Sequence, residues 1–327
     1  MNALCEQAVA AAVQTPAQTI RSVAGAYLDA YNGRDDSRYH RIGVWIRLMG
    51  DKSFIDITPE DIDAAMAMLA SESARVYAGK DADGNPIFRK KSGQRSGATL
   101  NRYLVALSSL YTWARKARIT PRGFESPTKH VEKHQESRGR VRYLKDGERE
   151  RLLDACRESP WPRLYLLALM AMTTGARRGE LLSLRWCDID FDMGEARIGE
   201  DATHHETKNG DARTLILLPA VLEELARFKP NKTTENTHLV FRSRLRPSQP
   251  YAMGDAFRSA MAEAGVKNFR FHDLRHTAAS YMAQSGASLL EIADTLGHRQ
   301  LRMVQRYAHL NTSSRRKLMS RVFEGRL

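Results

Sequence analysis

A group of histidine, arginine and tyrosine side chains toward the C-terminal end of the chain has the residue types to act on an anion. In the segment HDLRH, His272, Arg275 and His276 stand at positions i, i+3 and i+4, so a helix would place them on one face. His298 follows a predicted short helix that ends in glycine, and Tyr307 lies in an amphipathic run just beyond it. None of these side chains is a carboxylate, so the cluster suits an anion. A tyrosine with a pKa of about 10 becomes a useful nucleophile only when cationic donors surround its target.

Two upstream segments add cations to this group. In TGARRGEL (174–181), Arg177 stands at the start of a predicted helix, where backbone N–H groups would help its side chain to hold a phosphate. In TKNG (207–210), the Asn-Gly pair is a strong two-residue hairpin signal. This turn would place Lys208 at a projecting hairpin tip, from which its long side chain could reach a bound ligand.

Together these segments resemble the tyrosine recombinases of the phage-integrase type. H-x-x-R-H at 272–276, L-G-H at 296–298 and R-Y at 306–307 are similar to the C-terminal signature of that family. The segment 174–181 is similar to its first-arginine motif and 207–210 to its lysine hairpin. The motifs follow the family's order from about Arg142 to the C-terminus, and an ordered set is far more specific than any one of them.

The resemblance implies DNA strand exchange without a metal or nucleotide cofactor. Tyr307 would attack the scissile phosphodiester, form a 3′-phosphotyrosyl link and release a 5′-hydroxyl that attacks the same link on the partner duplex. Arg177 and Arg275 would hold the two non-bridging oxygens by bidentate bonds that lysine could not copy. Lys208 would be the general acid for the leaving oxygen. His272 would serve as base or phosphate donor, and His298 as a further donor.

Three neighbouring residues are expected to support this site rather than to react. On the family pattern, His276 has a packing or supporting role. Glu180 would orient the site, and Arg178 would lie at the surface or contact DNA.

Two metal-site patterns fail on their details. HDLRH has Asp273 where the zinc helix H-E-x-x-H requires glutamate, and Arg275 would repel a bound cation. The aspartates of 188–192 resemble the start of a calcium loop, but Met193 stands where that loop requires glycine. The sequence therefore predicts no metal and no cofactor.

Two other functions stay open beside site-specific recombination. A type IB topoisomerase shares the chemistry but relaxes a single duplex, and the chain length and the motif histidines favour the recombinase. A non-catalytic DNA-binding regulator on the same fold would lack some of the six motif residues. Integrases, resolvases and invertases share these motifs.

Composition points to a polyanionic partner in a reducing compartment. The 327 residues carry a formal charge of +13, and 42% of them are hydrophobic, as in ordinary globular proteins. Cys5, Cys156 and Cys187 show neither zinc nor disulfide spacing. The apolar run 164–172 is too short to span a bilayer, and the first residues lack the basic start of a signal peptide. We expect a bacterial cytoplasmic protein that is associated with the nucleoid when bound to DNA and has no membrane partner.

Hydrophobic periodicity divides the chain into five parts. We expect a mobile arm (1–17), a helical domain (18–118), a basic linker that is extended and mobile (119–142), a catalytic domain (143–310) and a C-terminal tail (311–327). The fold class is mainly α, with a small antiparallel β-sheet in the C-terminal domain. The resemblance implies an N-terminal SAM-like helical bundle that grips the core DNA site, followed by a mixed α+β catalytic domain.

The remaining predictions concern partners. The candidate DNA-contacting residues are basic and lie at edges of the predicted helices, in a turn-rich segment or in the linker: Arg89, Lys90, Lys91, Arg95, Arg102, Arg115, Lys116, Arg138, Arg140, Arg142 and Arg178. The resemblance implies double-stranded recombination sites, a homotetramer on two duplexes and, in some systems, accessory DNA-bending proteins. The apolar stripe of the tail would dock on a neighbouring protomer or, alternatively, on its own.

Overall fold

The computed structural model describes residues 18–33, 35–80, 86–137, 141–199, 212–231 and 237–324. Its internal contacts divide the chain into two compact units, Met1–Gly139 and Arg140–Leu327, and each unit has its own apolar core. The predicted arm (1–17) and the predicted hairpin tip with Lys208 lie outside the described residues. None of the described helices is long and apolar enough to cross a membrane.

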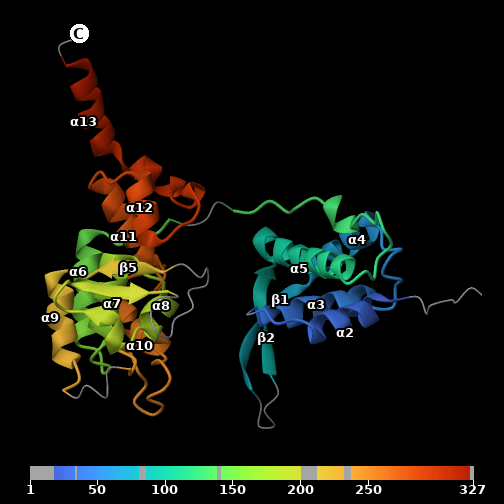
Figure 1. The fold of residues 1–327 in the computed structure, drawn as a ribbon, viewed down its shortest axis with the longest axis horizontal. Coiled ribbons are helices and arrows are strands. Elements are labelled where there is room, and N and C mark those ends of the chain that lie inside the picture. Colours follow the sequence, from blue (N-terminus) through green and yellow to red (C-terminus); the bar gives the residue numbers. More distant parts are fainter. Residues whose placement is uncertain are drawn as a thin grey trace, which may run out of the picture. The chain divides into compact units, whose positions relative to one another are not determined.

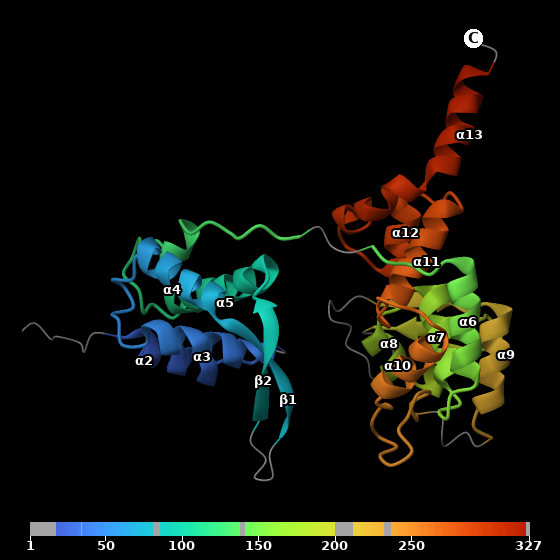
Figure 2. The same ribbon diagram turned by 180° about the vertical axis from the view of Figure 1, so that it is seen from behind.

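The first unit contains the helices α2 (Ile20–Asp29), α3 (Ser37–Met49), α4 (Pro59–Ser71) and α5 (Gly97–Lys116) (Figure 1 and, from behind, Figure 2). The side chains of Thr19, Thr58 and Ser96 each accept a backbone N–H at the start of a helix, as expected of good N-cap residues. At the centre, the indole of Trp45 is fully buried and donates to the carbonyl of Tyr103 over 2.9 Å. Apolar residues from all four helices pack in this core, in agreement with the hydrophobic periodicity of the sequence.

A β-hairpin separates α4 from α5. Strands β1 (Ser73–Lys80) and β2 (Pro86–Gln94) are antiparallel, so the domain predicted to be helical over 18–118 also contains a pair of strands. Helix α4 ends at Ser71, two residues before β1 begins. The Arg95 guanidinium donates to the Leu69 and Glu72 carbonyls over 2.6 and 3.0 Å, which satisfies orphan groups where the helix stops.

The segment after α5 is partly folded, unlike the extended linker predicted for 119–142. It contains a short 3₁₀-helix, η1 (Pro127–Lys129), and buries Val131 in the first unit's core. The side-chain amide of Asn101 on α5 donates to the His134 carbonyl and accepts from the His134 N–H, over 2.9 and 2.8 Å. A buried amide needs such partners, so this pairing fixes a segment that shows no sequence periodicity.

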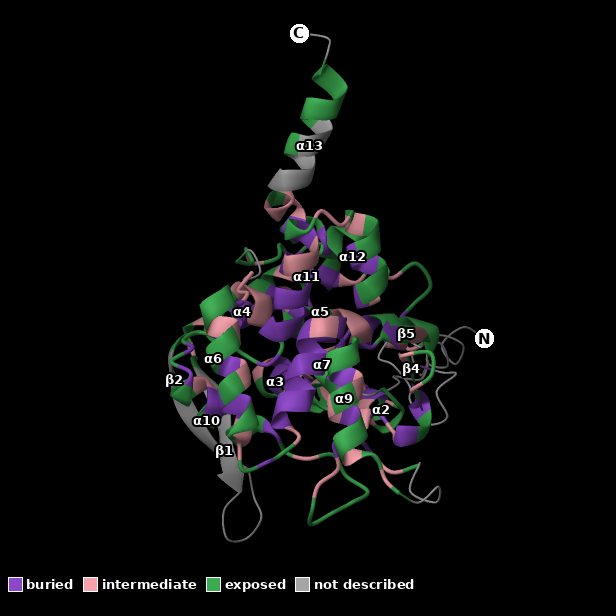
Figure 3. Cartoon of the chain, turned by 90° about the vertical axis from the view of Figure 1, so that its left-hand side faces the viewer, coloured by how far each residue is buried: buried purple, intermediate pink, exposed green. Residues whose placement is uncertain are grey.

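The second unit is built around one buried helix. Helix α7 (Leu164–Thr174) is buried along almost its whole length (Figure 3). Around it lie α6 (Asp146–Arg157), α8 (Arg178–Ser183), α9 (Pro219–Phe228) and α10 (Gly254–Glu263). The 3₁₀-helix η2 (Trp186–Asp188) leads into an antiparallel sheet in the order β3 (Ile189–Asp190), β4 (Glu195–Ile198), β5 (Arg213–Ile216). The prediction of a mainly α protein with a small antiparallel sheet is confirmed.

The C-terminal part of this unit carries most of the predicted chemistry. Helix α11 (Asp273–Gln284) packs against α7, and α12 (Leu289–Leu296) packs against α11. Two 3₁₀-helices follow, η4 (Leu301–Met303) and η5 (Gln305–Leu310), and η5 contacts α11. The last helix, α13 (Thr312–Phe323), projects from the end of this unit (Figure 1).

Candidate active site

The first arginine of the site is positioned by a glycine that ends α7. Gly175 has φ 63°, a left-handed conformation that favours glycine, and an added Cβ would collide with the Leu296 side chain. The chain then turns, and Arg177 becomes the N-cap of α8. This places Arg177 at the start of a helix, as the sequence predicted.

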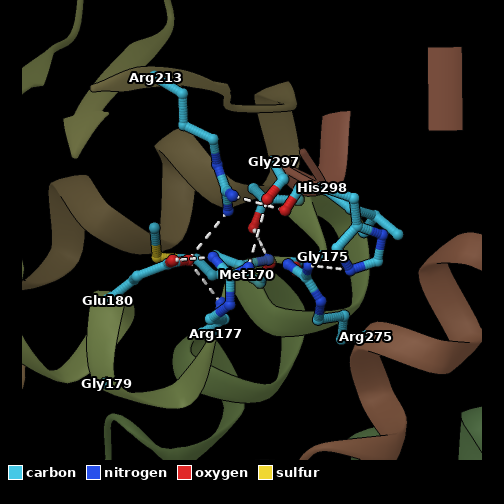
Figure 4. A network of polar contacts seen from close by, with 12 residues as sticks. Met170, Gly175, Arg177, Gly179, Glu180, Arg213, Arg275, Gly297 and His298 are labelled. Carbon is cyan, nitrogen blue, oxygen red and sulfur yellow. Dashed lines mark hydrogen bonds and ion pairs between the residues drawn. The ribbon is translucent and has the colours of Figure 1, made fainter. Parts of the chain in front are cut away.

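Glu180 holds two arginines from different parts of the chain (Figure 4). Its carboxylate accepts the Arg177 backbone N–H over 2.7 Å and the Arg177 guanidinium over 2.6 Å. The same carboxylate accepts from Arg213, the first residue of β5, over 2.9 Å. Arg213 also donates to the Leu296 carbonyl over 2.6 Å, and Arg177 donates to the Gly297 carbonyl over 3.2 Å. The orienting role expected for Glu180 is thus visible as contacts.

The second predicted arginine and the L-G-H histidine meet directly. Arg275 is 4% exposed and donates to the Gly175 carbonyl over 2.6 Å. Its other terminal nitrogen lies 2.7 Å from Nε2 of His298 (Figure 4). Gly297, with φ 63°, ends α12 and turns the chain toward this contact, and an added Cβ there would collide with Arg213. Residues more than a hundred positions apart therefore form one connected network.

Tyr307 lies in η5 and is only 1% exposed. Its hydroxyl is within hydrogen-bonding distance of Nδ1 of His276, the residue that follows Arg275 on α11. The His272 ring lies 5.4 Å from the His276 ring, measured between centroids. The predicted nucleophile is thus linked to the predicted histidine–arginine face by His276.

The family model described as "Phage integrase family" matches residues 142–314, more than half of the chain. The chain belongs to the phage integrase family. It is 27% identical over 319 residues to the integrase of Salmonella phage P22, covering 91% of this chain and 78% of that protein. It is 34% identical over 216 residues to a shufflon-specific DNA recombinase of Escherichia coli, covering 66% of this chain and 52% of that protein. The chain thus spans about half the length of the shufflon-specific recombinase.

Solved structures show the same fold. The Tn1549 transposon integrase, solved with a circular intermediate DNA, matches with a TM-score of 0.66 at 16% identity, over 93% of this chain and 99% of that chain. A lambda integrase dimer bound to a COC′ core site matches with a TM-score of 0.62 at 20% identity, over 88% and 95%. The family match and the related integrase and recombinase make the protein a tyrosine site-specific recombinase.

The arginine network of the recombinase carries an excess of positive charge. Arg177, Arg213 and Arg275 bring three guanidinium groups, and Glu180 is the carboxylate that pairs with two of them. Burial, together with Arg177 and Arg213, lowers the pKa of Arg275 to about 9. Burial raises the pKa of Glu180, but Arg213 and Arg177 outweigh it and hold that pKa below the usual value. An anion bound here would relieve the repulsion among the arginines.

The pKa values of the histidines and the tyrosine near the recombinase's arginines are shifted in the direction that favours the neutral forms. Burial, followed by Arg275 and Arg177, lowers the pKa of His298 to about 4. Partial burial and Arg275 also lower the pKa of His272. Burial raises the pKa of the Tyr307 phenol, although Arg306 and Arg275 oppose the shift. At neutral pH His298 is therefore uncharged and can accept its hydrogen bond from Arg275.

Arg213 is the member of the network that the sequence reasoning missed. It shares the inward face of β5 with the buried Leu215, two residues on, and a cation at an inward strand position is a signal that could have marked it. Lys208, five residues earlier in the sequence, lies outside the described residues.

The candidate DNA-contacting residues fall into different environments. Arg102, Arg115, Lys116 and Arg178 are exposed. Arg95 is only 8% exposed in its side chain and is engaged at the end of α4, and Arg142 pairs with Glu148 at the start of the second unit. Arg89, Lys90 and Lys91 lie in β2, but their side chains are outside the described set, as are Arg138 and Arg140 altogether.

Proposed function

We propose that this recombinase cuts and rejoins double-stranded DNA through a covalent link between Tyr307 and a 3′-phosphate. The observation that carries the proposal is the arginine network, in which Arg177, Arg213 and Arg275 share the single carboxylate of Glu180 and so carry surplus positive charge. A phosphodiester carries one negative charge, and its pentacoordinate transition state carries two. The network therefore favours the transition state over the ground state, which is what catalysis requires.

In the proposed cleavage step, Tyr307 Oη attacks phosphorus and the bond from phosphorus to the 5′ oxygen breaks. Arg177 and Arg275 hold the non-bridging oxygens, and each such preorganised donor is worth roughly 10²–10³ in rate. Lys208 protonates the leaving 5′ oxygen. When the phosphate is bound, the ring proton of His298 lies on Nε2, which then donates to the phosphate instead of accepting from Arg275. His272 is either a further donor or the acceptor of the phenol proton.

Rejoining reverses these bonds. The 5′-hydroxyl of the partner duplex attacks phosphorus, and the bond to Tyr307 Oη breaks. One phosphodiester is exchanged for another through a phosphotyrosyl ester of similar energy, so the cycle consumes no nucleotide. The arginines supply the positive charge at phosphorus, so the proposal requires no metal ion.

We also assign double-stranded DNA sites as the substrate, a homotetramer on two duplexes as the working assembly and the bacterial cytoplasm as its location. Two structural neighbours were solved as DNA complexes, and one of these proteins is a dimer on its core site. The formal charge of +13 and the exposed Arg102, Arg115, Lys116 and Arg178 suit a polyanion. Accessory DNA-bending proteins would act on the same DNA outside the core sites.

A covalent trap tests the proposed chemistry. A nicked duplex carrying the recombination site loses its 5′-hydroxyl fragment after cleavage, so the protein–DNA adduct accumulates. We expect Tyr307→Phe to abolish the adduct while DNA binding stays within about threefold, because the substitution removes one hydroxyl and keeps the ring. Tyr281→Phe is the matched control and should retain the adduct. An adduct on the Tyr307→Phe protein would assign the nucleophile to another residue.

A further inference from the structure

His276 is the neighbour to which the buried Tyr307 hydroxyl is hydrogen-bonded. The phenol is 1% exposed, so its hydroxyl needs a partner inside the protein, and Nδ1 of His276 lies within hydrogen-bonding distance. Arg275 precedes His276 on α11 but points elsewhere, toward the Gly175 carbonyl and His298. Adjacent residues on one helix therefore contact two different groups. Arg275 belongs to the arginine network, and His276 is hydrogen-bonded to Tyr307.

The direction of this hydrogen bond follows from the protonation states. Burial, followed by His272, lowers the pKa of His276 to about 4, so its ring is neutral at physiological pH. The phenol is also neutral, because burial raises its pKa. A neutral phenol and an imidazole nitrogen share one proton, so Tyr307 donates and Nδ1 accepts, with the ring proton on Nε2. The charged groups acting on this pair are Asp273, Arg275 and Arg306, besides His272.

We propose that His276 is the catalytic base that receives the Tyr307 proton during DNA cleavage. As the bond from Oη to phosphorus forms, the phenol proton moves to Nδ1 of His276, and the 5′ oxygen leaves with a proton from the general acid. In rejoining, the attacking 5′-hydroxyl gives its proton back to the general acid, and the imidazolium returns its proton to Oη as the phosphotyrosyl bond breaks. The phosphate bound by the arginines brings negative charge next to His276, which favours the imidazolium at the moment of attack.

This proposal rests on Tyr307 being the nucleophile, and it separates the roles of the two histidines. His272 is then a phosphate donor, because the hydroxyl of Tyr307 already lies on His276. Without a base, the reaction depends on spontaneous ionisation of the phenol. The rate of a base-deficient variant should therefore rise about tenfold per pH unit below the phenol pKa.

The test compares His276→Asn with the wild-type protein in single-turnover adduct formation on the nicked duplex between pH 6.5 and 9. Asparagine can keep a hydrogen bond to Tyr307 but cannot take its proton. We expect a loss of at least 10²-fold at pH 7 that shrinks as the pH rises. A fluorinated tyrosine has a more acidic phenol. Placing it at position 307 should raise the rate of adduct formation at least tenfold in His276→Asn and much less in the wild-type protein. His309→Asn, at an exposed position of η5, is the matched control and should behave as wild type.

Two outcomes would overturn the assignment. One is a His276→Asn protein that cleaves as fast as the wild type, and the other is a defect that neither pH nor fluorotyrosine changes, which would mark a packing role. Circular dichroism and DNA affinity identify a variant that fails to fold, and His276→Gln then repeats the comparison. If Tyr307→Phe still forms the adduct, the proposed nucleophile itself fails. If Tyr307→Phe is inactive and His276→Asn is unimpaired, only the base assignment fails.

Discussion

Arg213 and Glu180 are joined across 33 residues of sequence by an ion pair of 2.9 Å, with side chains only 14% and 7% exposed. Because Glu180 also pairs with Arg177, one buried carboxylate neutralises part of the charge of two arginines. Arg213 in turn holds the Leu296 carbonyl, next to Gly297 and His298. This pair therefore connects the first-arginine helix, the sheet and the L-G-H turn.

Removing the shared carboxylate should destabilise the second unit. Glu180→Gln deprives two partly buried guanidinium groups of the carboxylate that they share, and we expect a loss of roughly 3–5 kcal/mol in the free energy of unfolding. Arg213→Met should cost less, because Glu180 keeps Arg177. Urea denaturation of both variants and of the double variant measures the coupling. The control is Asp255→Asn, which breaks the exposed Asp255–Arg258 pair and should change stability by less than about 0.5 kcal/mol. If Glu180→Gln leaves the free energy of unfolding unchanged, the shared carboxylate does not stabilise the second unit.

Stability should fall as the solution is acidified from pH 6.5 toward pH 4. His298 and His276 have folded-state pKa values of about 4, below the ordinary histidine value, so the unfolded chain binds more protons in that window. Their contribution is fully present above pH 6.5 and is lost as the pH falls, by up to about 1.4 kcal/mol per pH unit for each histidine. Urea titrations at pH 7.5, 6 and 5 measure it. His298→Asn should show a shallower pH dependence than the wild type, and an unchanged slope would count against the shifted pKa.

A change of leaving group can distinguish the general acid, Lys208, from the residues that hold the non-bridging oxygens, such as Arg177. A substrate with sulfur in place of the bridging 5′ oxygen leaves as a thiolate, which requires no protonation. We expect Lys208→Ala to lose roughly 10²–10⁴-fold on the oxygen substrate and to recover most of this on the sulfur substrate. Arg177→Ala should stay impaired on both, because its defect lies at the non-bridging oxygens. Equal recovery of the two variants would remove Lys208 from the acid role.

Helix α13 carries apolar side chains that are exposed in the single chain. Met319, Val322 and Phe323 are 55%, 38% and 42% exposed, and an isolated helix of this length is only marginally stable. If these side chains dock on a neighbouring protomer in a closed ring, Val322→Ser with Phe323→Ser should weaken tetramer assembly on paired sites at least tenfold. Binding to a single site should survive. Arg321→Ala on the same helix is the control. Sedimentation of the DNA complexes reports the outcome, and intact tetramers from the double variant would exclude trans docking.

Local chemistry in the sequence was enough to predict most helices and to group several residues that the structure brings together. Thr58 with Asp61 forms the capping box that starts α4, and Ser288 caps α12, because capping depends on residues three apart. Gly175 and Gly297 end helices where the pattern stops, since both adopt left-handed backbone conformations. The motif residues Arg177, Arg275 and His298 could be grouped before their contacts were known, because the order of several short motifs is specific.

Contacts between residues far apart in sequence were decided only by the tertiary structure. Asn101 fixes the segment around His134, and this pairing made a folded element of residues predicted to be an extended linker. Arg213 joins Glu180 to the Leu296 carbonyl, and the Tyr307 hydroxyl is hydrogen-bonded to His276 rather than to an arginine. Periodicity and capping report on neighbours within about one or two helical turns. Buried polar groups, in contrast, take whichever partner the packed core brings within reach, so their pairing appears only when the chain is folded.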